Sequence, residues 1–193
     1  MKKNIFFVIL ILAAVGFVLS RLNFGFLFQN QSELVKPKTK KDISPTPIPF
    51  NQLTVPYLQN KDYQSQLNEL NQLSENNNYT SYLTSYNSDD LKINGLLTIP
   101  NGNQPNNGWP AIVFIHGYIP PKEYQTTEKY TDYVDYLARN GFVVLKIDLR
   151  GHGQSEGNPS GAYYSSDYII DTLNAYSALQ NSDFVNTQNV GLW

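Results

Sequence analysis

The chain contains no cysteine and only two histidines, His116 and His152, among its 193 residues. The absence of cysteine excludes disulfides, thiolate zinc sites, a cysteine nucleophile and a lipid-modified anchor cysteine. Two histidines are also too few for a histidine-rich metal site. The composition therefore leads us to expect neither a metal nor a cofactor.

Positive charge is scarce outside the N-terminal region. Residues 1–41 hold seven lysines and arginines against one glutamate, whereas residues 42–193 hold seven against fifteen aspartates and glutamates. Binding to phosphate backbones needs clustered lysine and arginine side chains. The acidic body of the chain therefore argues against nucleic acid as a partner.

The one long apolar run lies at the N-terminus. Two lysines precede an uncharged apolar run over residues 5–19, which is long for a signal peptide and slightly short for a membrane span. Beyond Arg21 the apolar composition resumes over residues 22–28. We expect residues 1–28 to form a single-pass signal anchor that contacts membrane lipid through residues 4–28, with the domain extracytoplasmic. The alternative is a cleaved signal peptide and a secreted product.

Two further regions follow this segment. Residues 29–56 contain five prolines and four lysines, a composition typical of an extended stalk. Residues 57–193 remain, which is enough for one modest domain and too few for two. Within them, residues 57–78 carry three leucines at helical spacing and predict a short helix that leads into the domain.

From residue 79 onward the pattern alternates between strand and helix. Turn-forming residues separate the first two predicted strands, so these form an antiparallel hairpin. The later strands are continuous apolar runs, typical of parallel strands buried on both faces. This order predicts a mixed α/β sheet. The predicted strands are 79–86, 91–99, 111–115, 142–147 and 189–193, and the predicted helices are 127–139 and 166–180.

Polar residues follow two of the predicted strands. The sequence HGY at residues 116–118 follows the strand 111–115, and DLRGHGQSEG at residues 148–157 follows the strand 142–147. Ligand sites in open α/β sheets lie beyond the carboxyl ends of the strands. We therefore expect the functional site to be built from these two loops.

Together and in this order, the motifs resemble the first half of an α/β-hydrolase. The run from the hairpin through IPPKEY and YLARNGFVVLKIDLRGHGQSEG is most similar to the prolyl oligopeptidase and dienelactone hydrolase branch. The resemblance covers about residues 79–193. It implies an α/β fold: the N-terminal half of an α/β-hydrolase sheet, with an antiparallel hairpin, then parallel strands with flanking helices, preceded here by a membrane anchor.

The resemblance also implies roles for particular residues. The backbone N–H of Tyr118 would donate to an oxyanion, and Gly117 would keep this oxyanion loop open. The identity of the donor is open by one residue, and the alternative is that Tyr118 only packs at a loop. His116 would be a structural group that hydrogen-bonds within the loop. The remaining motif residues would form a structural polar network in which Arg150 pairs with Asp148 or Asp167: Asp148, Arg150, His152 and Ser155.

The sequence GQSEG at residues 153–157 matches the G-x-S-x-G nucleophile elbow, but we reject Ser155 as the nucleophile. Turn-forming residues follow it where an elbow needs a helix, and no histidine follows His152, although the triad in this fold runs serine, acid, histidine. The resemblance places the elbow directly after the strand 189–193. We therefore expect the sequence to be an N-terminal part that ends just before its nucleophile, with the acid and base also lying outside it.

Two functions of different class follow from these observations. The first is a serine hydrolase that acts on a small-molecule ester or peptide substrate by acyl transfer through a Ser–His–Asp triad. The 193-residue chain alone would then be inactive. The second is a non-catalytic, membrane-anchored surface binding module with a partial hydrolase fold. The reading frame after Trp193 discriminates between them, whereas the peptidase and esterase branches share all of these motifs.

Overall fold

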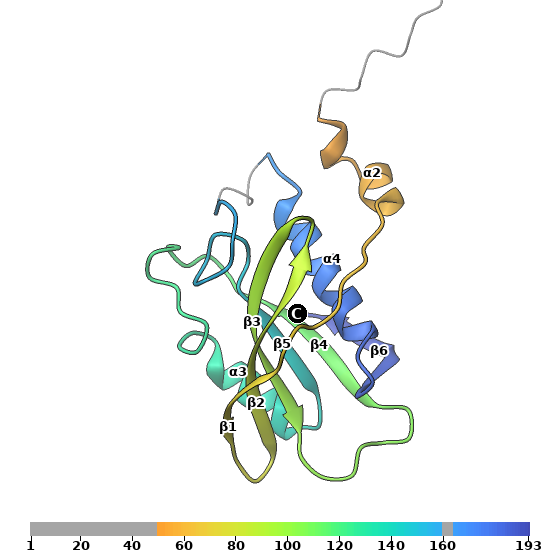
Figure 1. The fold of residues 1–193 in the computed structure, drawn as a ribbon, viewed down its shortest axis with the longest axis vertical. Helices are drawn as coiled ribbons and strands as arrows, with labels where there is room; N and C mark the ends of the chain where they lie inside the picture. The colour runs from red at the N-terminus through yellow and green to blue at the C-terminus, as the bar shows by residue number, and fades with distance from the viewer. Residues whose placement is uncertain (1–49, 160–163) are drawn as a thin grey trace, which may run out of the picture. The chain divides into compact units, whose positions relative to one another are not determined.

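The computed structural model describes residues 50–159 and 164–193, which belong to a compact unit that spans Ile48–Trp193 (Figure 1). The predicted signal anchor and residues 29–49 of the predicted stalk lie outside the described residues, whereas the last seven stalk residues, 50–56, are described. Among the helices in the two described ranges, none has both the length and the apolarity needed to cross a membrane.

The described residues form one six-stranded sheet with the strand order β1-β2-β3-β5-β4-β6. The pairs β1–β2, β2–β3 and β3–β5 are antiparallel, whereas the pairs β5–β4 and β4–β6 are parallel. The predicted hairpin followed by parallel strands is therefore confirmed. The strands are β1 (Asn71–Glu75), β2 (Tyr79–Ser88), β3 (Leu91–Pro100), β4 (Trp109–Ile115), β5 (Val143–Ile147) and β6 (Val185–Leu192).

Two helices pack against opposite faces of this sheet. α4 (Asp167–Gln180) contributes Ala175, Ala178 and Leu179 to the larger apolar core, which includes alternate residues of β3, β4 and β5. α3 (Thr131–Arg139) packs Val134 and Leu137 on the other set of alternate residues. All five residues of β5 are buried because helices cover both faces there, as its continuous apolar run predicts.

The helix predicted over residues 57–78 is wrong. The short helix α2 (Val55–Asn60) comes earlier, after the 3-10 turn η1 (Asn51–Leu53), and the chain is then extended through an isolated bridge into β1. The residues of β1 pair with β2 as a strand instead of forming a helix. Leu67 and Leu70 pack on the core, whereas Leu73 is about half exposed. The predicted pattern therefore does not mark one face of a helix.

Two other boundaries differ from the sequence prediction. α3 begins at Thr131 and not at residue 127, because Tyr130 adopts a left-handed conformation with φ of 62° and stops the helix there. β6 begins at Val185, four residues before the predicted strand. Its polar residues lie in an irregular stretch of the β4–β6 pairing, where no apolar pattern could mark a strand.

The strand ends bring the two polar loops together. Ile115 pairs with Ile147 at the ends of β4 and β5. The N–H of Ile115 donates to the carbonyl of Trp193, with an N···O distance of 2.8 Å, so the end of β6 lies at the same edge. The residues that follow β4 and β5 therefore emerge side by side.

Candidate functional site

A cleft of about 730 Å³ lies at this edge of the sheet, between the loops after β4 and β5 and the first turns of α4. Seven of its thirteen lining residues are leucine, isoleucine or proline, and none is aspartate, glutamate, lysine or arginine. The cleft can therefore hold an uncharged group. The lining residues are Ile115, His116, Gly117, Tyr118, Pro121, Leu149, His152, Pro159, Tyr168, Ile169, Thr172, Leu173 and Leu192.

The loop after β4 contains backbone N–H groups without a hydrogen-bond partner. The N–H of Gly117 donates to the hydroxyl of Tyr130, with an N···O distance of 3.1 Å. The Gly117 carbonyl lies 2.8 Å from His116 Nδ1 and accepts from it. The N–H groups of His116, Tyr118 and Ile119 make no hydrogen bond to any of the described residues. Of these three residues only Tyr118 is exposed, at 90%, so its N–H is the candidate donor to a ligand.

Tyr130 fixes the position of this loop. A Cβ atom on residue 117 would lie 2.6 Å from the Tyr130 hydroxyl, so any larger residue there would displace this hydroxyl. Tyr130 itself is in the left-handed region, which costs about 1 to 3 kcal/mol for a residue that is not glycine. The sequence analysis placed Tyr130 only within the predicted helix 127–139, and no sequence signal marks its role here.

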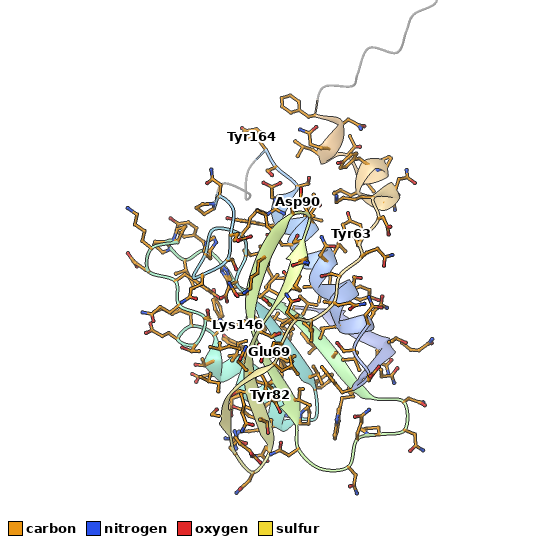
Figure 2. All side chains as sticks on the ribbon, in the orientation of Figure 1. Tyr63, Glu69, Tyr82, Asp90, Lys146 and Tyr164 are labelled. Carbon is orange, nitrogen blue, oxygen red and sulfur yellow. The ribbon has the colours of Figure 1, made fainter. Side chains whose placement is uncertain are left out.

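Asp148 lies fully buried in a polar cluster beneath the loop after β5. It accepts hydrogen bonds from the hydroxyls of Tyr124, with an O···O distance of 2.6 Å, and Thr126. Lys146, fully buried on β5 (Figure 2), donates to the Tyr124 hydroxyl with an N···O distance of 3.0 Å. Burial raises the pKa of Asp148 and lowers the pKa of Lys146. The predicted alternative in which Asp148 pairs with Arg150 is wrong, since these hydroxyls satisfy the carboxylate.

Arg150 pairs chiefly with Asp171 of α4, a residue that the sequence did not single out. The Nη2–Oδ1 distance is 2.7 Å, and Nε lies 3.0 and 3.1 Å from the two carboxylate oxygens. The backbone N–H of Arg150 also donates to this carboxylate. The predicted partner Asp167 lies farther away, with an Nη1–Oδ1 distance of 3.3 Å. The signal that could have found Asp171 is its position four residues after Asp167, on the same helix face.

Asp171 also connects the loop to the hairpin. Its carboxylate accepts from the hydroxyl of Ser88, with an O···O distance of 2.7 Å, and its carbonyl accepts from the hydroxyl of Tyr86. Asp171 and Tyr86 are fully buried, and Arg150 is only 7% exposed. The β2–β3 hairpin, the loop after β5 and α4 therefore meet at the buried carboxylate of Asp171.

The geometry at Ser155 and His152 is that of a turn. Ser155 Oγ accepts from the N–H of Asn94, and the N–H of Ser155 donates to the carbonyl of His152. The next helix begins at Asp167, so Ser155 does not precede a helix as an elbow serine does. Within the described ranges, no serine hydroxyl is hydrogen-bonded to a histidine and no three metal-ligating side chains cluster.

His116 is a buried histidine with one unsatisfied ring nitrogen. Its ring contacts that of Tyr124 in a tilted arrangement and that of His152 edge to face, at centroid distances of 4.4 and 4.9 Å. Nε2 has no hydrogen-bond partner among the described residues. Burial lowers the pKa of His116 from 6.5 to about 4, with smaller contributions from the nearby His152 and Lys146. The ring is therefore neutral at pH 7 and donates from Nδ1.

Comparisons with known proteins agree with this architecture. Residues 109–188 match the family model described as serine aminopeptidase, S33. A thiohydrolase from Aspergillus aculeatus, aneE, is 30% identical over 105 residues, which cover 54% of this chain and 30% of that protein. This chain therefore spans less than a third of that relative.

Two solved structures have a similar fold. The acetyl xylan esterase from Paenibacillus sp. R4 has a TM-score of 0.51 at 20% identity, over 69% of this chain and 46% of that one. A hypothetical protein of Pseudomonas aeruginosa has a TM-score of 0.51 at 20% identity, over 65% and 40%. The mixed sheet with its flanking helices resembles part of an α/β-hydrolase fold, and the predicted fold class is confirmed at that level.

The Arg150–Asp171 pair predicts the effect of a neutralising substitution. Asp171→Asn should lower the free energy of unfolding by about 3 to 5 kcal/mol, because it leaves the buried guanidinium without its main partner. Asp167→Asn removes the same charge from a side chain that is 36% exposed and should cost about 1 kcal/mol or less. Urea unfolding of the two variants at pH 7 measures this, and equal losses would contradict the assignment of the main partner.

His116 predicts a pH dependence of stability. Because its pKa in the folded chain lies below its ordinary value, protonation favours the unfolded chain. Its contribution to stability is complete above pH 6.5 and falls as the pH is lowered toward 4, by about 3 kcal/mol in all. His116→Gln should lose this dependence. The measurement is the difference in unfolding free energy between the two proteins at pH 7, 5.5 and 4, and a constant difference would refute the prediction.

Proposed function

We propose that the chain is the N-terminal part of a serine hydrolase that transfers an acyl group from an ester or peptide bond to water. The observation that carries this proposal is the unpaired N–H of Tyr118 at the wall of an uncharged cleft. Attack on a carbonyl group places a negative charge on its oxygen, and a fixed backbone N–H stabilises this charge. The neighbouring Gly117 N–H cannot serve, because Tyr130 accepts its hydrogen bond.

The names of the similar proteins support this class of reaction. They include an esterase, a thiohydrolase and an aminopeptidase family, and ester, thioester and peptide hydrolysis all pass through a tetrahedral oxyanion. The DLRGHGQSEG loop supports the finer proposal that the chain belongs to the prolyl oligopeptidase and dienelactone hydrolase branch.

The proposal also needs a serine, an acid and a histidine. The described residues do not bring such a triad together, and the similar proteins are at least twice as long as the segment matched here. We therefore propose that the triad is completed by the part of the protein that corresponds to the unmatched length of these relatives. The second backbone donor of the oxyanion hole would come from the residue after the nucleophile.

The proposed location follows from the apolar N-terminus. A single-pass anchor over residues 1–28, with lipid contacts through residues 4–28, would hold the domain at the extracytoplasmic face of a membrane. N-terminal sequencing of the mature protein tests this. An intact Met1 or Lys2 supports the anchor, whereas a start at Arg21 would show a cleaved signal and a secreted product.

The reading frame after the codon for Trp193 is the first test of the activity. A G-x-S-x-G elbow with a later acid and histidine supports the hydrolase. A stop codon at that point instead supports the non-catalytic binding module. In either case, the 193-residue chain should hydrolyse p-nitrophenyl acetate no faster than its Ser155→Ala variant. A rate that disappears in this variant would contradict the structural role of Ser155.

The role of Tyr118 is tested in the chain extended through its elbow and triad. Tyr118→Pro removes the backbone N–H and should lower kcat about 100- to 1,000-fold, the usual effect of losing one oxyanion donor. Tyr118→Ala is the matched control, because it keeps the N–H and removes only an exposed side chain. Equal kcat values for the two variants would refute the donor assignment.

A further inference from the structure

We propose that the cleft beside Tyr118 selects a neutral, apolar acyl group and rejects charged peptide substrates. The assignment of the ligand as an acyl group depends on the proposed function, whereas the selectivity for a neutral apolar ligand depends on the cleft alone. The cleft has the size of a small-molecule site, since such sites usually occupy about 300 to 1,000 Å³.

The lining offers no counter-ion to a charged ligand. None of the thirteen lining residues is aspartate, glutamate, lysine or arginine. The guanidinium of Arg150 is paired with Asp171, and Lys146 donates a hydrogen bond to the hydroxyl of Tyr124. A ligand carboxylate or ammonium group would lose its hydration without gaining a partner. The free termini of a short peptide are therefore disfavoured.

The lining combines polar groups and apolar side chains. His116, Gly117 and Tyr118 come from one loop, where the unpaired N–H of Tyr118 suits a carbonyl oxygen. The apolar lining residues include Ile169 and Leu173 on α4 and Leu192 at the end of β6. Ile169 and Leu192 are 50% and 53% exposed, so a ligand that covers them removes apolar surface from water. A carbonyl group with an alkyl chain matches this arrangement.

The test measures binding and does not depend on turnover. Methyl ketones keep the carbonyl oxygen of an ester and have no leaving group, so 2-pentanone, 2-heptanone and 2-nonanone form a suitable series. The full 193-residue chain is held in lipid nanodiscs, and protein-free nanodiscs are the blank for partition into lipid. Saturation-transfer difference NMR gives the dissociation constants. Affinity should rise about fourfold for each methylene group that the cleft covers.

Two comparisons make the result specific to the cleft. Ile169→Gln should weaken the binding of 2-nonanone roughly fivefold, because it removes apolar contact from the α4 wall. Leu73→Gln is the matched control, since Leu73 is also about half exposed but lies on β1, outside the cleft. It should leave the binding unchanged. The zwitterionic dipeptide Ala-Ala should bind more weakly than any of the ketones.

The outcomes separate this inference from the proposed function. Length-dependent ketone binding that Ile169→Gln weakens supports the inference, even if the extended protein hydrolyses no ester. Affinity that does not change along the ketone series overturns it, as does equal binding of Ala-Ala. The inference also fails if the ketones bind equally to both variants, even when the extended protein proves to be an active hydrolase.

Discussion

The fully buried carboxylate of Asp171 is the interaction on which the arrangement of the site depends. It holds the guanidinium and the backbone N–H of Arg150, and it accepts from Ser88 on the hairpin. Removing two charges from water is costly unless their remaining hydrogen-bonding groups are satisfied, which is the case here. Asp171 thereby holds α4, the loop that follows β5 and the hairpin together. The part of the cleft lining that comes from α4 and from this loop is fixed in position.

Buried polar and charged residues lie at this edge of the sheet, whereas the cleft beside them is lined by uncharged side chains. Lys146 donates to the hydroxyl of Tyr124, and this hydroxyl donates to Asp148, so the two buried groups are connected through Tyr124. His116 is neutral because burial lowers its pKa to about 4. Buried charges therefore organise the loops, while the cleft that these loops line contains no acidic or basic side chain apart from histidine.

The sequence predicted most of the sheet, because continuous apolar runs mark strands such as β5 that are buried on both faces. It also predicted that the loops after β4 and β5 emerge at one edge of the sheet, as they do. It failed over residues 57–78, where strand pairing overrides leucine spacing. Asp171 could have been found from its spacing to Asp167. Tyr130 could not, because its role depends on a left-handed backbone angle that no pattern encodes.

The double role of Tyr130 links two parts of the molecule that no sequence pattern connects. Tyr130 is the N-cap residue of α3, and its hydroxyl accepts a hydrogen bond from the backbone N–H of Gly117. One hydrogen bond therefore connects the start of α3 to the loop that carries Tyr118. Under the proposed function, substitutions that shift the first turn of α3 would change the position of the proposed oxyanion donor while leaving the side chains that line the cleft in place.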